Sequence, residues 1–236
     1  MIYRAPMTRK EMVKDIAFVI PARLESTRLK HKMLMKFDGE PLIRIVFDKV
    51  RMMGYDTFVA TDSPKIAEII PERNVIMTDN AENGTARISQ LGDILDEYDN
   101  IINIQGDMID ISYQTVKPFI DRIKDNYFVY TGYTKDYEPN GVKVIHQEGK
   151  AMWFTRSDIG YGDRHIGIYM YKPYALSCYD LLTNAYPQEN LEQNRYLGLY
   201  DIKVCRVKYD GREINTKDDL WNIENNTRQY IEVVHT

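Results

Sequence analysis

Apolar residues in the first half of the chain fall into short runs separated by amphipathic stretches. Ile16 to Ile20 is a continuous apolar run, which is typical of a strand buried on both faces of a parallel sheet. Three further short runs predict strands in the same way: Thr57 to Ala60, Val75 to Met77 and Ile101 to Ile104. We therefore predict four buried strands here, with helices between them.

The stretches between these strands carry helical signals. After an Asp38-Gly39 turn, Pro41 suits the first position of a helix and Gly54 suits its stop. Further helices are predicted over 64–70 and 86–98. Strands that alternate with helices through short links predict crossover units on a parallel sheet. The first of these helices is predicted from apolar residues at helical spacing: Leu42, Val46, Val50 and Met53.

The pattern changes near residue 127, where strand-like runs follow one another closely. We predict that this half is mixed and extends the first sheet. The chain then consists of a short N-terminal arm, 1–15, and one domain, 16–236, without a flexible linker. The predicted strands of the second half cover 127–133, 142–146, 152–155 and 166–171, and its predicted helices cover 187–199 and 216–230.

Composition narrows the class of protein. The 236 residues are 44% hydrophobic and 28% charged, with a formal net charge of −4, as in an ordinary globular domain. The acidic balance disfavours a general nucleic-acid or anionic-membrane surface. No apolar run is long enough to cross a bilayer, and the first fifteen residues lack the apolar region of a secretory signal. Cys178 and Cys205 have no disulfide or metal-ligand pattern, so we expect an intracellular protein.

Two of the predicted strands end in charged loops of opposite sign. The loop from Pro21 to Lys32 is basic, and the segment from Gln105 to Asp110 contains Asp107. Because the carboxyl ends of parallel strands share one edge of a sheet, we expect these loops to meet. Arg and Lys neutralise phosphate oxygens, and a carboxylate offers the hard oxygen that Mg²⁺ prefers. The pattern favours a site for a nucleoside triphosphate with a divalent cation.

Each feature also has an ordinary structural interpretation. A basic loop is commonly a solvated surface, and an Asp after a strand is commonly a turn residue or a helix cap. His165 would suit a hydrogen-bonded core position. Neither GxxxxGK[ST] nor GxGxxG occurs, which disfavours a P-loop kinase and a dinucleotide dehydrogenase. The pattern alone therefore indicates a phosphate-binding α/β protein and leaves the reaction open.

Nine segments in order sharpen this interpretation. IPARLESTRLKHKML, at 20–34, closely resembles the N-terminal signature IPARxxSTRLPGKPL of the 3-deoxy-manno-octulosonate cytidylyltransferases. The resemblance covers nearly the whole chain after the arm. It implies the nucleotide-diphospho-sugar transferase fold, which is α/β with a mostly parallel central sheet, helices on both faces and a mixed C-terminal extension. The other matching segments are VATD at 59–62, NGTAR at 83–87, NIQGD at 103–107, PNGVKVI at 139–145, WFTR at 153–156, RHIGIY at 164–169, LEQNR at 191–195 and INTKDDL at 214–220.

The resemblance also implies an activity. This family couples CTP to an eight-carbon acidic sugar for lipopolysaccharide biosynthesis, forming a CMP-sugar and pyrophosphate. It implies Mg²⁺ as cofactor, a cytoplasmic location and a homodimer, with neither nucleic acid nor membrane as a partner. The nucleotide-binding half would be 16–125, and 126–236 would bind the sugar and form the dimer.

The resemblance places site residues in four overlapping sets. The catalytic set is Arg23, Lys32, Gln105 and Asp107. The nucleotide-binding set is Pro21, Ala22, Arg23, Ser26, Arg28, Lys32, Asn83, Gly84, Thr85 and Gln105. The sugar-binding set is Arg87, Gln105, His165, Tyr169, Glu192 and Gln193, and the metal ligands are Asp107 and Asn215.

The chain departs from the family pattern at several places. Lys30-His31 replaces the Pro-Gly of the first signature, and Met108-Ile109 replaces the Glu-Pro that usually follows QGD. Asn215 stands where the family has its second metal-binding Asp, so the ion should be held more weakly. The segment between Arg156 and Arg164 is short and is a place where sugar selectivity could differ. Another acidic sugar or nucleotide, or a homologue that binds without turnover, therefore stays open.

Overall fold

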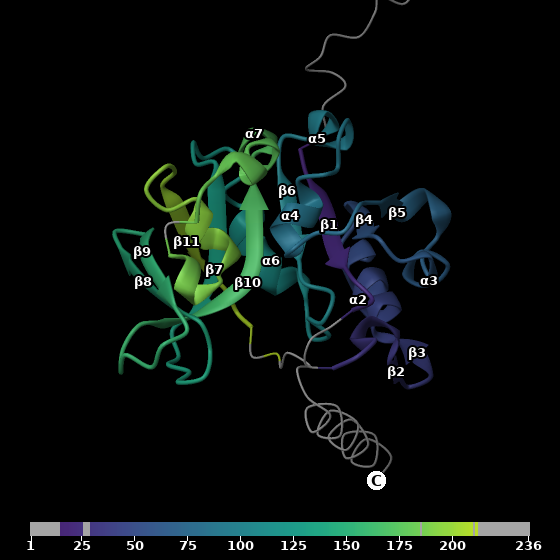
Figure 1. Ribbon diagram of the computed structural model, residues 1–236, viewed down its shortest axis with the longest axis horizontal. Helices are drawn as coiled ribbons and strands as arrows, with labels where there is room; N and C mark the ends of the chain where they lie inside the picture. Colours follow the sequence, from purple (N-terminus) through teal and green to yellow (C-terminus); the bar gives the residue numbers. More distant parts are fainter. Residues whose placement is uncertain (1–14, 26–28, 185, 210, 212–236) are drawn as a thin grey trace, which may run out of the picture.

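The computed structural model describes residues 15–25, 29–184, 186–209 and 211. Its centre is one nine-stranded sheet with the strand order β5-β4-β1-β6-β10-β7-β11-β9-β8, seen across Figure 1. The strands are β1 (Ala17–Ala22), β4 (Asp56–Thr61), β5 (Val75–Met77), β6 (Ile101–Ile104), β7 (Val129–Thr134), β8 (Lys143–Gln147), β9 (Lys150–Thr155), β10 (Asp163–Tyr171) and β11 (Ile202–Arg206).

The predicted parallel half is confirmed. β1 pairs in parallel with β4 on one side and β6 on the other, and β4 pairs in parallel with β5. β1 continues two residues beyond the prediction, through Pro21, which is opposite Ala60 of β4. The pairing of β1 with β6 ends earlier, at Val19 and Asn103, so a proline without an N–H is tolerated there.

The elements that follow β1 are also close to the prediction. Asp38 and Gly39 have φ angles of +47° and +86° and join β2 (Lys36–Phe37) to β3 (Glu40–Pro41), because left-handed conformations at both positions suit a tight hairpin turn. α2 (Leu42–Arg51) confirms the predicted helix, with Pro41 as its N-cap and not at its first position, and Gly54 follows with φ +88°. The predicted helix at 64–70 is present but shorter, as α3 (Pro64–Ala67).

The second half is mixed, as predicted. β10 lies antiparallel between β6 and β7, β11 is parallel to β7, and β9 and β8 follow as an antiparallel hairpin. β10 thus joins the second half to the first in one continuous sheet. The division into an arm and one domain with halves at 16–125 and 126–236 stays a prediction.

Two predicted helices are wrong in extent. The helix expected at 86–98 is two short helices, α4 (Gly84–Ile88) and α5 (Ile94–Glu97), because Gly92 between them has φ +55°. The helix expected at 187–199 is two 3-10 turns, η4 (Pro187–Glu189) and η5 (Glu192–Arg195), separated by Asn190 with φ +48°. The helix expected at 216–230 lies outside the described residues.

Among the elements of five or more residues, three were not predicted. α6 (Tyr113–Ile120) contains Pro118 and a Thr-Val pair, and α7 (Pro173–Ser177) has only five residues, so their helical signal is weak. β11 forms through its parallel pairing with β7, which is a contact between segments distant in the sequence. Three more 3-10 turns complete the described elements: η1 (Lys32–Leu34), η2 (Glu72–Asn74) and η3 (Tyr179–Leu181).

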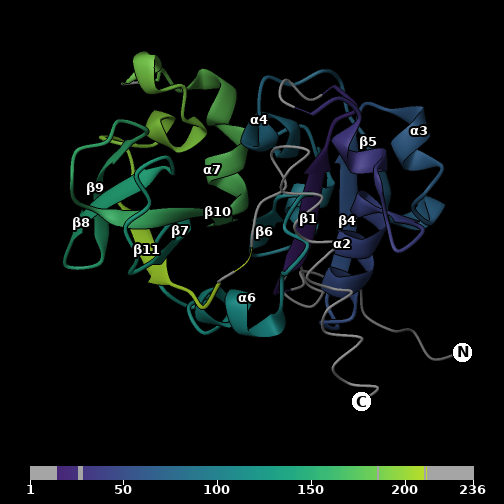
Figure 2. The ribbon, with the colours of Figure 1, turned by 90° about the horizontal axis from the view of Figure 1, so that it is seen from below.

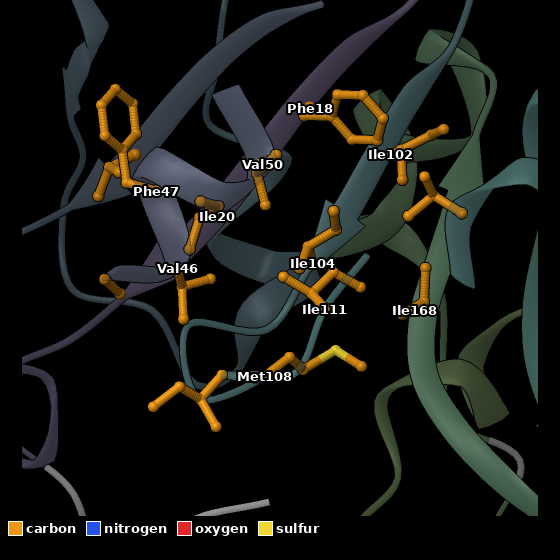
Figure 3. Close-up of a cluster of buried hydrophobic side chains, with 14 of the residues drawn as sticks. Phe18, Ile20, Val46, Phe47, Val50, Ile102, Ile104, Met108, Ile111 and Ile168 are labelled. Atoms are coloured by element: carbon orange, nitrogen blue, oxygen red, sulfur yellow. The ribbon is translucent and has the colours of Figure 1, made fainter. Parts of the chain in front are cut away.

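Helices cover both faces of the sheet, with α2 and α6 on one side and α4 and α7 on the other (Figure 2). The face under α2 and α6 buries one apolar cluster, and Figure 3 shows Val46, Phe47 and Val50 of α2 together with Ile20 of β1 and Ile104 of β6 in that cluster. The opposite face buries a second cluster that includes residues of α4 and α7. None of the helices within the described residues combines the length and apolar character needed to cross a lipid bilayer.

Candidate active site

The carboxyl ends of β1, β4, β5 and β6 lie on one edge of the sheet, because these strands are parallel. β10 runs the other way, and its Ile168 is opposite Ile104, the last residue of β6. The first half of β10, with His165, therefore extends past the end of β6 on the same edge. The loops predicted to bind a nucleotide and the strand predicted to bind a sugar thus adjoin one another.

The basic loop and the carboxylate meet at this edge. Lys32 Nζ donates a hydrogen bond to Asp107 Oδ2 at 2.5 Å, and both side chains are mostly buried, with exposed fractions of 12% and 14%. The two residues are 75 positions apart in the sequence. Arg23 directly follows β1 and is exposed, while Pro21 and Ala22 are buried within that strand. The described part of the basic loop therefore offers one paired cation, Lys32, and two exposed ones, Arg23 and Lys30.

Gln105 lies between two glycines from different elements. A Cβ atom on Gly84 would be 3.2 Å from Pro21 Cγ and 3.5 Å from Gln105 Nε2. A Cβ atom on Gly167 of β10 would be 3.4 Å from Gln105 Cγ. These close approaches join the predicted nucleotide loops to β10, and glycine allows them because it has no side chain.

The NGTAR segment forms the start of α4. The Asn83 side chain accepts a hydrogen bond from Ala86 N at 2.8 Å, as a helix N-cap does. Its amide group also donates to Tyr179 Oη at 2.9 Å. Glu192 Oε2 accepts from Thr85 N at 2.9 Å, so a carboxylate from η5 lies at the start of α4. Burial raises the pKa of the Glu192 carboxyl above its usual range.

Four of the residues predicted to bind sugar are connected to one another or to the nucleotide segment. Tyr169 Oη donates to Gln193 Oε1 at 3.1 Å, and the Tyr169 ring centroid is 5.6 Å from that of His165. His165 Nε2 shares a hydrogen bond with Thr131 Oγ1 at 2.8 Å. Burial, with the nearby positive charge of Arg156, lowers the pKa of His165 to about 3, so the imidazole is neutral.

Arg87 has different surroundings. Its guanidinium is buried and donates to Asp62 Oδ2 at 2.9 Å and to Thr78 Oγ1 at 2.6 Å. Asp62 and Thr78 directly follow β4 and β5, so Arg87 ties the ends of these two strands together. The contacts of Arg87 explain why VATD and NGTAR occur together, and its predicted role at the sugar stays a prediction.

Sequence reasoning missed two kinds of residue here. The positive charge of Arg156, at the end of the WFTR segment, acts on His165, although no role was predicted for it. Asn103 and Asn194 are completely buried, and the amide atoms of both lack a hydrogen-bond partner within the described residues. Asn103 is two residues before Gln105, and Asn194 directly follows Gln193, so these unpaired buried amides are a signal for a polar ligand that only burial reveals.

Asp107 is the predicted metal ligand that lies within the described residues. Ser26, Arg28 and Asn215 lie outside the described residues. Within the described ranges, no three or more His, Cys, Asp or Glu side chains gather closely enough to hold a metal ion. Mg²⁺ is commonly held by one or two carboxylates together with substrate phosphates, so the Asp107 carboxylate fits that ion when a triphosphate is bound.

The fold is that of nucleotidyltransferases with the nucleotide-diphospho-sugar transferase fold. A 4-diphosphocytidyl-2C-methyl-D-erythritol synthase from Anaerococcus prevotii superposes with a TM-score of 0.61 and 13% identity, over 91% of this chain and 96% of that one. A structure of CMP:2-keto-3-deoxy-manno-octonic acid synthetase in complex with CTP superposes with a TM-score of 0.82 and 29% identity, over 92% of this chain and 100% of that one.

Sequence comparison then defines the family. Residues 17–209 match the cytidylyltransferase family. A 3-deoxy-manno-octulosonate cytidylyltransferase from Acaryochloris marina is 33% identical over 231 residues, which span 87% of this chain and 94% of that protein. The chain belongs to the 3-deoxy-manno-octulosonate cytidylyltransferase family, and the resemblance noted from its motifs is confirmed.

Proposed function

We propose that this enzyme couples CTP to 3-deoxy-manno-octulosonate and releases a CMP-sugar and pyrophosphate. The observation that carries the proposal is the meeting of Lys32 and Asp107 at the carboxyl edge of the sheet. It supplies a cation and a metal-binding oxygen at one point, beside the Gly84–Gln105–Gly167 contacts. Family membership supports the same nucleotide and the same class of sugar.

The reaction is a displacement at phosphorus. An oxygen of the sugar's anomeric hydroxyl bonds to the α-phosphorus of CTP, the bond to the bridging oxygen breaks, and pyrophosphate leaves while the hydroxyl loses its proton. Catalysis here requires positioning and neutralisation of phosphate charge more than a covalent intermediate. Arg23 and Lys32 would neutralise phosphate oxygens, and Gln105 would orient the reacting groups. Mg²⁺, held by Asp107 and Asn215, would supply further charge neutralisation at the triphosphate.

The sugar acid would lie along β10 and η5. Its hydroxyl groups match the polar side chains of Tyr169, Glu192 and Gln193, which lie together there. Its carboxylate matches a guanidinium, since Arg binds carboxylates through two parallel hydrogen bonds. Arg156 is exposed and lies two residues after Phe154, whose ring packs against His165 with the centroids 5.2 Å apart, so we assign it this role.

The decisive experiment measures pyrophosphate release by the full chain with Mg²⁺. CTP and 3-deoxy-manno-octulosonate should give the fastest release in a panel of all four nucleoside triphosphates and several eight- and nine-carbon sugar acids. A faster reaction with another sugar acid would support the proposed nucleotidyl transfer but would show that the acceptor is a different sugar. Absence of release with every pair, while CTP still binds, would favour a homologue that binds nucleotide without turnover.

We further propose a cytoplasmic homodimer. Phe128 and Tyr174 in the second half are exposed to 44% and 62%, and their ring centroids are 6.1 Å apart. The ring of Tyr200 lies 5.6 Å from that of Phe128 and extends this aromatic patch. Exposed aromatic clusters are typical of protein interfaces. The free thiols of Cys178 and Cys205 suit a reducing compartment.

A further inference from the structure

Lys143, on β8, is completely buried, and no carboxylate of the described residues lies within ion-pair distance of its ammonium. Its ammonium donates to three main-chain carbonyl oxygens: Pro139 O at 2.7 Å, Gly141 O at 2.8 Å and Arg156 O at 3.1 Å. All three donors of the ammonium are therefore used. A buried charge is costly unless it is fully hydrogen-bonded, so this arrangement holds the Arg156 carbonyl firmly in place.

Glu189, in η4, holds the same residue from the other side. Its Oε2 accepts from Arg156 N at 2.8 Å, and its Oε1 accepts from Thr155 Oγ1 at 2.6 Å. The N–H and C=O groups of Arg156 are thus each bound to a charged side chain. Hydrogen bonds to ionised groups are stronger than neutral ones, so the main chain of Arg156 has little freedom to move.

Lys143 also contacts the far end of the loop that begins at Arg156. Gly162 has φ +104°, and a Cβ atom on it would be 3.2 Å from Lys143 Cβ. One lysine therefore holds both ends of the loop 156–162, its ammonium at the start and its stem at the end. This is the segment whose shortness suggested a difference in sugar selectivity.

The side chain of Arg156 contrasts with its main chain. The residue is exposed, and within the described residues its guanidinium makes no hydrogen bond or ion pair. Phe154, two residues before Arg156, packs its ring against His165 with the centroids 5.2 Å apart, so Arg156 follows a strand that adjoins the predicted sugar-binding residues. A fixed main chain with an unpaired guanidinium is the arrangement expected of a side chain that is held ready for an anionic ligand.

We propose that Lys143 and Glu189 are positioning residues, which fix the main chain of Arg156 so that its guanidinium receives the carboxylate of the sugar acid. The inference rests on the proposed function, because it takes the acidic sugar as the ligand. Neither residue touches the substrate. Their effect passes through Arg156 and should appear in sugar binding, while CTP binding should be unaffected.

The test combines two single variants and their double variant. Glu189→Ala removes the hydrogen bonds to Thr155 and Arg156 but leaves the buried Lys143 in place, so the protein should fold. Loss of this preorganisation should raise the KM for the sugar acid about tenfold and leave the KM for CTP unchanged. Arg156→Ala should raise the same KM at least as much. Glu189→Ala should then add nothing to Arg156→Ala, because both act through one guanidinium.

Two further variants distinguish positioning from general stability. Glu189→Gln keeps an acceptor oxygen and should restore part of the lost sugar affinity. Lys150→Met removes an exposed ion pair between Lys150, at the start of β9, and Asp201, and should change neither KM. The proposal would be overturned if the double variant raised the KM for the sugar acid by the product of the two single effects. It would also be overturned if Glu189→Ala raised the KM for CTP as much as the KM for the sugar acid.

Calorimetric titration of the sugar acid without nucleotide separates this inference from the proposed function. If the unaltered enzyme binds the sugar but releases no pyrophosphate, the proposed activity fails, and the same variants still test the role of Arg156 through the measured affinity. If Arg156→Ala binds the sugar as tightly as the unaltered enzyme does, the inference fails while the activity stands.

Discussion

The ammonium of Lys32 and the carboxylate of Asp107 belong to two loops that are far apart in the chain and adjacent in the fold. Their 2.5 Å contact is formed because β1 and β6 are parallel neighbours whose carboxyl ends share an edge. The individual residues were predicted from charge and from motif resemblance. Their pairing depends on the register of the sheet.

Asp107→Asn tests the carboxylate directly. The amide keeps an oxygen for Lys32, so the free energy of unfolding should change little. The negative charge is lost, and kcat for pyrophosphate release should fall by about 100-fold or more, as when one preorganised electrostatic group is removed from an active site. The matched control is Asp121→Asn, which removes an exposed pair with Lys117 and should leave kcat unchanged. Near-normal turnover in Asp107→Asn would refute the assignment.

His165 gives a pH prediction for stability. Its pKa is about 3 in the folded state because of burial, against about 6.5 in an unfolded chain. Below pH 6.5 the unfolded state therefore binds a proton that the folded state does not, and stability decreases as the pH falls toward 3. His165→Gln removes this effect and retains a group that can bond to Thr131.

Urea unfolding of both proteins at pH 7 and pH 5 measures the effect. Relative to His165→Gln, the unaltered enzyme should lose about 2 kcal/mol of unfolding free energy between these two values. Between pH 7 and pH 8 the difference between the two proteins should stay nearly constant. A constant difference down to pH 5 would show that His165 titrates normally in the folded state.

Among the elements, α2 shows why an apolar stripe predicts a helix well. Its five buried residues all belong to the apolar cluster on this face of the sheet, and Phe47 is completely buried there (Figure 3). Phe47→Ala should lower the free energy of unfolding by about 3–5 kcal/mol, because it removes buried apolar area and leaves a cavity. Met52→Ala, at the end of the same helix, is the control, since Met52 is 84% exposed and its loss should cost less than about 0.5 kcal/mol. Urea unfolding curves at neutral pH measure both.

The elements that were mispredicted have a different physical cause. Between residues 86 and 98 the composition suits a helix, but Gly92 adopts a left-handed conformation and the chain forms two short helices. Between 187 and 199, Asn190 interrupts the chain in the same way, and η5 turns so that Glu192 reaches Thr85 of α4. In this second segment tertiary contacts override local propensity, and its Glu192 lies at the site.

At the scale of the whole molecule, an aromatic patch in the second half is exposed. If Phe128, Tyr174 and Tyr200 form the dimer interface, Tyr174→Glu places a charge within it and should give a monomer. Light scattering after size-exclusion chromatography measures the mass of the unaltered protein and the variant. Tyr113→Glu is the control, because Tyr113 is 42% exposed on α6 and lies outside this patch. A dimer that survives Tyr174→Glu would place the interface elsewhere.

The amino-acid sequence was sufficient for the fold class, the four parallel strands of the first half and the family, because apolar periodicity and motif order are local properties of a chain. Sheet order is not local. The insertion of β10 between β6 and β7 brings His165 and Gly167 past the end of β6, where Gly167 meets Gln105. The hydrogen bonds from Lys143 and Glu189 to the main chain of Arg156 likewise join β8 and η4 to the residue that follows β9. Such contacts join segments that are far apart in the sequence, and local sequence patterns do not specify them. Only the folded arrangement therefore reveals which individual side chains meet.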